Sequence, residues 1–370
     1  MIRERLKTSK RYRKLKHLYD KHERVLIPGT LIFGVAVDFV TFRSIEINAA
    51  FILLLMHLIV AGSTIAFMHI YDAGSRKTQE TRWRYLRLAA PLIVQFTFGA
   101  LLSASLIFYW FSGSFSVSWP FMIIIASLMA SNDVLRNYYL KPVVQVGVYY
   151  FIIFSLFALV LPYIFNSIEP WVFLVSGVAS LFAILLYVQF LGRYLFSVRS
   201  QRSGIALMVI TIFVSMNVLY FANVIPPIPL SLTDAGIYHS VQRVNGSYVV
   251  EEENDGWLDS VLPGQTIHAV SGERIYVFAS IFAPAALDTT IYHQWQHYDE
   301  DDREWVDWSR PSYSLFGGRG DGYRGFSFSN NIQPGLWRVD VETERGQTMG
   351  RVRFRVEMVD EAVELHEVTK

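Results

Sequence analysis

The sequence predicts an α-helical polytopic membrane domain with seven transmembrane helices, followed by an all-β sandwich of immunoglobulin-like architecture. Two observations carry this prediction. Apolar runs long enough for helices to cross the core of a bilayer recur through residues 25–224. After residue 230 the apolar residues recur with a period of two, which is typical of half-buried β-strands. Between the two regions, residues 225–230 contain three prolines, which cannot continue a helix.

Charge divides the chain at the same place. The 370 residues carry a net charge of +1. Residues 1–224 hold 21 basic and 9 acidic residues (+12), whereas residues 225–370 hold 12 and 23 (−11). Halves of opposite charge indicate two different surroundings and no nucleic-acid partner. The chain has no cysteine, which excludes disulfides and thiolate metal sites.

The basic N-terminal segment, residues 1–24, precedes the first apolar run. It holds ten Lys and Arg against three acids, and its apolar residues recur at roughly helical spacing. This pattern indicates a cytoplasmic amphipathic helix on the membrane surface. Seven apolar runs then define the predicted spans, of which the fourth is the weakest. They are 25–42, 49–71, 89–111, 114–130, 143–165, 171–191 and 205–224.

The loops between these runs predict the orientation of the chain. The N-terminus and the alternate loops carry twenty Lys and Arg, and the opposite loops carry only Arg43. Lys and Arg accumulate on the cytoplasmic side of membranes. We therefore expect a cytoplasmic N-terminus and a C-terminal domain on the opposite side of the membrane.

Two polar residues inside the predicted spans are candidates for function. Asp38 and His57 are placed to meet at similar depth in the first and second spans, where such a pair would relay a proton or sense pH. The alternatives are a buried structural pair, or an Asp38 that reaches the interface near Arg43. Amides such as Gln145 are more often hydrogen-bonding links between helices.

The C-terminal region divides into a proline-rich connector (225–235), a β-sandwich (236–358) and an acidic tail (359–370). Residues 336–344 alternate between apolar and charged side chains, with Trp337, Val339 and Val341 on one face. Residues 350–356 alternate with the same period, so we expect the two segments to form a hairpin. Residues 274–282 are apolar on both faces, which indicates a central strand. Further strands are expected near 238–252, 289–298, 304–309 and 323–329.

Residues 292–298 are the most distinctive stretch of this domain. As a strand, they place His293, Trp295 and His297 on one face. Positions i and i+4 of a strand stand about 13 Å apart, too far to share one zinc ion, so no metal is predicted. An aromatic platform for a sugar or peptide is one interpretation, and packing of Trp295 in the core is the other. The acidic turn after it, 299–302, is interpreted as solvated rather than calcium-binding.

A glycine-rich loop at residues 317–325 holds Arg319 and Arg324. Such loops can turn successive N–H groups toward an anion, and guanidinium groups can close over it. A flexible hairpin turn is the simpler interpretation. The local positive charge in a domain of net −11 makes this loop the best anion-site candidate in the sequence.

Several short motifs follow one another in the C-terminal region: Pro226-Pro227-Ile228-Pro229-Leu230, Gly236-Ile237-Tyr238-His239, Phe282-Ala283-Pro284, His293-x-Trp295, Gly317-Gly318-Arg319, Gly322-Tyr323-Arg324 and Pro334-Gly335-x-Trp337-Arg338-Val339. In this order they resemble a bacterial inner-membrane family whose C-terminal domain is known only as domain of unknown function 2914. The resemblance covers about 220–357 well and the membrane part loosely. It implies a Gram-negative inner membrane and a periplasmic β-domain, and it brings no activity, cofactor or catalytic residue.

The sequence therefore favours a non-catalytic domain that binds an envelope glycan, an anion or a protein partner. The candidate ligand-binding residues are His239, His293, Trp295, Arg319 and Arg324. Motifs of common enzymes are missing, and no cofactor is predicted. Two alternatives stay open: a membrane carrier or channel that uses Asp38 and His57, and an envelope enzyme acting on lipid or glycan with His239, His293 and the arginine loop as its catalytic face.

Overall fold

The computed structural model describes residues 47–74, 81–113, 115–134, 142–226, 230–244, 246–253, 265–283, 287–316 and 323–370, with a few single positions before residue 47. The chain forms two compact units, one helical and one β-rich. The β-rich unit runs from Ala222 to Lys370 and includes two short segments, Tyr109–Trp119 and Phe165–Ile168.

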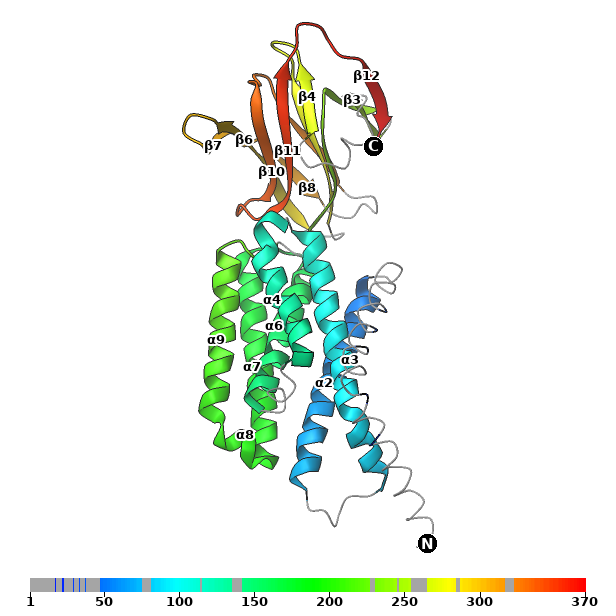
Figure 1. The fold of residues 1–370 in the computed structure, drawn as a ribbon, viewed down its shortest axis with the longest axis vertical. Helices are drawn as coiled ribbons and strands as arrows, with labels where there is room; N and C mark the ends of the chain where they lie inside the picture. The colour runs from blue at the N-terminus through cyan, green and yellow to red at the C-terminus, as the bar shows by residue number, and fades with distance from the viewer. Residues whose placement is uncertain are drawn as a thin grey trace. The chain divides into compact units, whose positions relative to one another are not determined.

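Apolar helices make up the first unit (Figure 1). In chain order they are α2 (Ile47–Ala73), α3 (Thr81–Ser112), α4 (Phe115–Val134), α6 (Pro142–Phe165), α7 (Pro170–Tyr194), the short α8 (Phe196–Ser200) and α9 (Arg202–Phe221). Five of them, α2, α3, α6, α7 and α9, are long and apolar enough to cross a membrane, judged by length and composition. The apolar part of α4, Val117–Met129, is shorter, in line with the weakness of the fourth predicted span. The first predicted span lies almost entirely outside the described residues.

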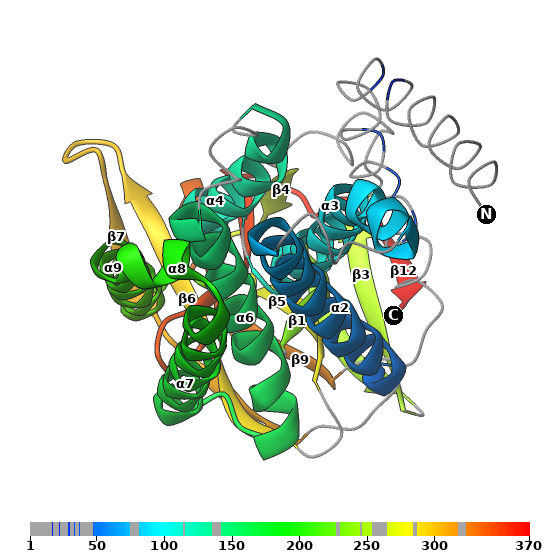
Figure 2. The same cartoon turned by 90° about the horizontal axis from the view of Figure 1, so that it is seen from below.

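Helix α6 packs at the centre of this unit, between α2 and α7 (Figure 2). The Tyr149 hydroxyl of α6 donates a hydrogen bond to the Leu58 carbonyl of α2 (3.0 Å), and the Tyr187 hydroxyl of α7 donates to the Gly62 carbonyl (2.8 Å). Gly62 permits this approach, because a Cβ there would lie 2.3 Å from the Tyr149 hydroxyl oxygen. Away from water, a buried hydroxyl needs a protein partner, and neighbouring helices supply it.

A second polar contact joins the same two helices. His69 of α2 lies 2.6 Å from the side-chain oxygen of Gln145 on α6. The predicted role of Gln145 as a link between helices is therefore confirmed.

The described strands of the β-rich unit form three sheets. The strands are β1 (Ser231–Tyr238), β2 (Ser240–Val244), β3 (Ser247–Glu253), β4 (Gln265–Ala269), β5 (Ile275–Phe282), β6 (Asp288–Asp299), β7 (Glu304–Ser309), β8 (Ser312–Phe316), β9 (Tyr323–Ser329), β10 (Gly335–Thr343), β11 (Thr348–Met358) and β12 (Leu365–Thr369). Sheet A has the order β1-β5-β9. Sheet C has the order β4-β11-β10-β6-β7, with β8 beside β6, and sheet B has the order β12-β3-β2.

The hairpin expected at 336–356 is confirmed as β10–β11. Trp337, Val339 and Val341 are each fully buried, and the alternating charged residues lie on the outer face of sheet C. Asp340 stands opposite Arg351 and accepts hydrogen bonds from its guanidinium group. The same register places a second pair of side chains, Arg338 and Arg353, directly opposite each other, although they carry like charges.

Strand β5 is central, as its apolar character on both faces predicts. Its Val277 packs in one core with Trp295 and Trp337 of sheet C, and its Phe278 packs in another core with Val250 of sheet B. Strand β5 is therefore covered on both faces, which explains why residues 274–282 lack the alternation of a solvent-facing strand.

Two segments differ from the expected division of the domain. Sheet A begins within the proline-rich connector, because β1 starts at Ser231. Part of the expected acidic tail forms a strand, β12, which pairs with β3. The physical reason is that Val368 packs against the core around Val250 and Phe278, while the acidic residue of β12, Glu367, remains in solvent.

Candidate functional site

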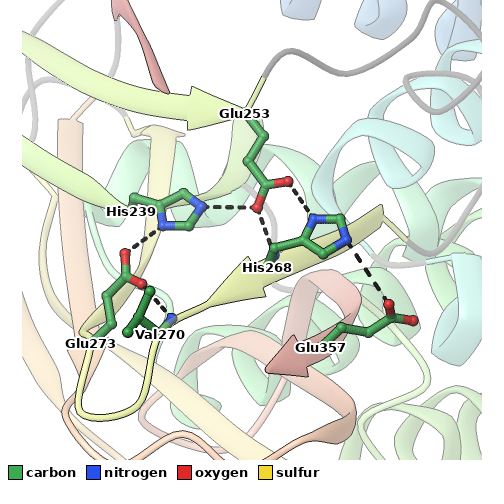
Figure 3. Close-up of polar contacts among 6 residues, drawn as sticks. All are labelled: His239, Glu253, His268, Val270, Glu273 and Glu357. Carbon is green, nitrogen blue, oxygen red and sulfur yellow. Dashed lines mark hydrogen bonds and ion pairs between the residues drawn. The ribbon is translucent and has the colours of Figure 1, made fainter. Parts of the chain in front are cut away.

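Two histidines and three glutamates from separate segments meet in the β-rich unit (Figure 3). His239 follows β1, Glu253 ends β3, and His268 lies in β4. Glu273 belongs to the turn before β5, and Glu357 lies near the end of β11. We call these five residues the His–Glu cluster.

His239 is held between two carboxylates. Its side chain is 2% exposed, and its Nδ1 lies 2.6 Å from Oε1 of Glu273 while its Nε2 lies 3.0 Å from Oε1 of Glu253. An ionised carboxylate can only accept hydrogen bonds, whereas a neutral imidazole has one donor and one acceptor. The two contacts therefore require a second proton, which makes His239 an imidazolium or leaves one of the carboxylates protonated.

Glu253 is the centre of the cluster. It accepts hydrogen bonds from the backbone N–H of His268 (2.6 Å), from Nδ1 of His268 (2.7 Å) and from His239. Burial acts to raise the pKa of Glu253, but the hydrogen bonds from His268 and His239 outweigh it, and the pKa is lowered. The carboxylate also satisfies a backbone donor of β4, the edge strand of sheet C.

The remaining two glutamates complete the surroundings of the histidines. Glu273 accepts a hydrogen bond from the backbone N–H of Val270 (2.8 Å), which closes the turn that carries it. Glu357 lies 3.9 Å from Nε2 of His268. Among the described residues, no group of three or more His, Asp or Glu side chains has the geometry of a metal site. The cluster can hold protons between acceptors and can fix β3 to β4.

A third histidine, His293, lies in the core with entirely different partners. Its Nδ1 is 2.7 Å from the hydroxyl of Ser327, which also accepts a hydrogen bond from Nε1 of Trp295 (2.9 Å). The Tyr313 hydroxyl is 3.3 Å from its Nε2. Burial lowers the pKa of His293 to about 4. His293 and Trp295 are both 0% exposed, so neither ring offers a face to a sugar or peptide.

Two further predicted site residues, Arg324 and His57, lie in the described part of the chain, and each makes a hydrogen bond to another partner. Arg324 donates a hydrogen bond to the main-chain oxygen of Lys370 (3.3 Å). His57 donates through Nδ1 to the Leu53 carbonyl of its own helix (2.8 Å). Arg319 and Asp38 lie outside the described residues.

The outer face of sheet C carries residues that the sequence analysis did not select. Arg338 of β10 lies over the ring of Trp305, with its guanidinium carbon 4.4 Å from the ring centroid, and donates through Nε to the side chain of Gln296. Burial and the charges of Arg351 and Arg353 lower the pKa of Arg338. Arg353 and Arg355 of β11 are exposed on the same face. The signal for them was present, since the GRVRFRV pattern places its arginines on one face.

The sequence analysis also missed the glutamate partners of His239 and His268, but for a different reason. Glu253 ends an acidic run, 251–253, which resembles an ordinary solvated strand face. Only the pairing of distant strands reveals that its carboxylate reaches two histidines.

Residues 288–356 match the family model described as "Protein of unknown function (DUF2914)". The match runs from the start of β6 into β11 and so includes most of sheet C. It bears out the resemblance to this uncharacterised family at the C-terminal end of the chain. No curated protein matches the sequence.

Solved structures show only remote similarity. A β-glucosidase from Listeria innocua, in complex with gluconolactone, is 16% identical with a TM-score of 0.21, and the match covers 30% of this chain and 17% of that one. The chain thus spans less than a fifth of that enzyme. The alkylpurine DNA glycosylase AlkC of Pseudomonas fluorescens, bound to DNA, is 11% identical with a TM-score of 0.20, and the match covers 83% of this chain and 99% of that one. These values are too low to support any inference.

Proposed function

We propose, starting from the DUF2914 region that this chain carries at residues 288–356, that the protein is an inner-membrane protein whose β-domain recognises a ligand or partner in the bacterial envelope. The membrane region has seven spans, the N-terminus is cytoplasmic, and the β-domain is an immunoglobulin-like sandwich in the periplasm. Recognition serves sensing or assembly rather than catalysis.

The observation that carries this proposal is the outer face of sheet C. Strand β5 of sheet A is buried on both faces against other sheets. By contrast, Arg353 and Arg355 on the outer face of sheet C are exposed, and the rings of Tyr298 and Trp305, on strands β6 and β7 of the same sheet, are half-buried. A broad sheet face with exposed charges and flat rings is suited to binding another molecule.

Two further observations support the membrane part. Five described helices have the length and composition of membrane spans. The distribution of Lys and Arg, twenty against one between the two sets of loops, favours an odd number of spans and a C-terminal domain outside the cytoplasm.

The topology is tested with single cysteines, because the natural chain has none. Asp301→Cys lies in the exposed turn between β6 and β7, and Ser200→Cys lies at the end of α8 in a predicted cytoplasmic loop. A thiol reagent that cannot cross the inner membrane should label Asp301→Cys in cells with a permeabilised outer membrane. It should label Ser200→Cys after lysis only. The reverse pattern would place the β-domain in the cytoplasm.

Recognition is tested with a photo-crosslinking amino acid in place of Arg353, in the full chain in living cells. A matched control carries it in place of Arg243, an exposed residue on β2 of sheet B. A crosslinked species that forms from position 353 and not from 243 is expected. Identical or absent products at the two positions would contradict recognition by this face.

A further inference from the structure

Three arginines gather on the outer face of sheet C. Arg338 on β10 is directly opposite Arg353 on β11, and Arg355 follows Arg353 on the same face of β11. Directly opposed residues of an antiparallel pair have Cβ atoms about 5 Å apart, and residues i and i+2 of a strand are about 7 Å apart. Three positive charges therefore share a small patch in a region whose net charge is −11.

The charges of Asp340 and Asp307 act on Arg338, but the acids near the patch have other hydrogen-bond or ion-pair partners. Asp340 is engaged by Arg351, and Asp307 accepts a hydrogen bond from Gln296 (2.6 Å). Glu357, the next outward-facing residue of β11 after Arg355, lies within 3.9 Å of His268. Among the described residues, none of the ion pairs includes Arg338, Arg353 or Arg355. Like charges directly opposite each other on a sheet are unfavourable, and a bound anion relieves the repulsion.

Aromatic and amide groups adjoin the arginines. Tyr298 and Trp305 pair across β6 and β7, with ring centroids 5.2 Å apart in an edge-on arrangement. Gln296 connects Arg338 to Asp307 through hydrogen bonds. Tyr and Trp combine a flat apolar surface with a polar edge, which suits the C–H faces and hydroxyls of sugar rings.

We propose that this patch, made by Arg338, Arg353, Arg355, Tyr298 and Trp305, binds a carbohydrate chain that carries carboxylate or phosphate groups. The arginines bind the acidic groups, and the rings pack against the sugars. The proposal rests on the proposed recognition role of sheet C and names the ligand class.

An acidic polypeptide is the other polyanion that such charge would attract. The combination of rings and arginines favours a carbohydrate, because charge alone needs no aromatic neighbours. Guanidinium forks bind planar carboxylates and phosphates through paired hydrogen bonds, and the adjacent rings give the apolar contact that sugar rings require.

The test measures binding by the full chain in lipid nanodiscs. The probes are an oligogalacturonate, a neutral oligosaccharide of equal length and an oligoglutamate of equal charge. The oligogalacturonate is expected to bind tightest, with an affinity that falls as salt is raised. The double variant Arg353→Gln/Arg355→Gln should weaken this binding at least about tenfold, since each charge-assisted hydrogen bond that is lost contributes on that scale.

Matched controls separate the patch from general charge. Arg243→Gln/Arg303→Gln removes the same charge from exposed residues on β2 and in the β6–β7 turn, and it should leave the affinity within about twofold. Trp305→Ala should weaken the oligogalacturonate and leave the oligoglutamate unaffected. Thermal denaturation of each variant checks that the β-domain stays folded.

Three outcomes would overturn the inference. One is oligoglutamate binding as tight as oligogalacturonate, which would indicate an acidic protein. Another is an equal effect of the two double variants. The third is that no acidic carbohydrate binds. If no acidic carbohydrate binds but position 353 still gives a specific crosslink in cells, only the carbohydrate ligand is refuted. If neither the binding nor the crosslink is observed, the recognition role is refuted as well.

Discussion

His293 and His239 are both buried in the β-rich unit, but their ring nitrogens face different partners. Those of His293 face the hydroxyls of Ser327 and Tyr313, which can both donate and accept hydrogen bonds. Those of His239 face the carboxylates of Glu253 and Glu273, which accept when ionised. A neutral imidazole satisfies the first setting, and the second needs an additional proton. Both rings are buried, so the difference between their partners decides which hydrogen bonds each histidine can make.

The largest effect is expected where the neutral network is broken. Ser327→Ala removes the shared partner of His293 and Trp295 and leaves two buried polar groups without a hydrogen bond. We expect a loss of about 2–5 kcal/mol in the free energy of unfolding of the β-domain, since each such group costs about 1–3 kcal/mol. Hydrogen exchange of the amides of β6 and β9 in the full chain measures it. Ser329→Ala, a buried serine of the same strand, is the control and should cost less than about 1 kcal/mol.

The same network predicts a dependence on pH. The pKa of His293 is about 4 in the folded chain, below its ordinary 6.5. The unfolded chain therefore takes up the proton first, so the domain loses stability as pH falls from about 6.5 to about 4. The loss is roughly 3 kcal/mol. His293→Gln should flatten this part of the profile of stability against pH, and an unchanged slope would contradict the assignment.

A smaller effect is expected in the charged network. Glu253→Gln keeps the shape of the side chain but removes the charge that accepts hydrogen bonds from His239 and His268. The expected loss is about 2 kcal/mol at neutral pH, measured by hydrogen exchange of β3 and β4. Glu252→Gln, the neighbouring acid on β3, should change stability by less than about 0.5 kcal/mol.

Both networks lose stability as pH falls, so the pH window of the loss, rather than its sign, distinguishes this network from that of His293. The pKa of Glu253 is lowered in the folded chain, so its contribution is present above the ordinary pKa of glutamate and is lost as pH falls through the lowered value. This window lies below that of His293. Wild type and Glu253→Gln should therefore converge only in strong acid. Convergence near pH 6 would show that Glu253 is not the group involved.

The smallest effect is expected at His268, whose side chain is 37% exposed. His268→Gln removes the ring contact with Glu253, but the backbone N–H of this residue still donates to the same carboxylate. We expect a loss below about 1 kcal/mol in the same exchange measurement. A loss equal to that of Glu253→Gln would show that the ring, rather than the backbone, supports the cluster.

The sequence predicted the hairpin, the central strand and the apolar helices, because each of these features depends on residues that are close together in the chain. The alternation around Trp337 gave the β10–β11 hairpin, and the two apolar faces of 274–282 gave the central place of β5. Five of the predicted spans have described helices with the properties of membrane spans. These features follow from periods of two residues or from the thickness of a bilayer, and both are visible in a short window.

The composition of the His–Glu cluster could not be predicted in this way. Glu253, His268 and Glu273 come from three segments, and their meeting depends on how distant strands are placed. Strand β12 is a similar case, because the acidic residues around it suggested a solvated tail while its place depends on pairing with β3. For Trp295, the local pattern predicted its position on one face of a strand. Whether that face is buried depends on distant residues, namely Ser327 and the apolar side chains of sheet A.

The pairing of β12 with β3 also has a consequence for the order of folding. Sheet B cannot be completed until residues 365–369 have emerged from the ribosome, long after β2 and β3. Until then the aromatic side chains of Tyr276, Phe278 and Phe326 lack part of their cover. Contacts between such distant parts of a chain form slowly. A nascent chain in this state has exposed rings and an unpaired strand edge, so the pairing of β12 with β3 is the step that protects the domain from aggregation.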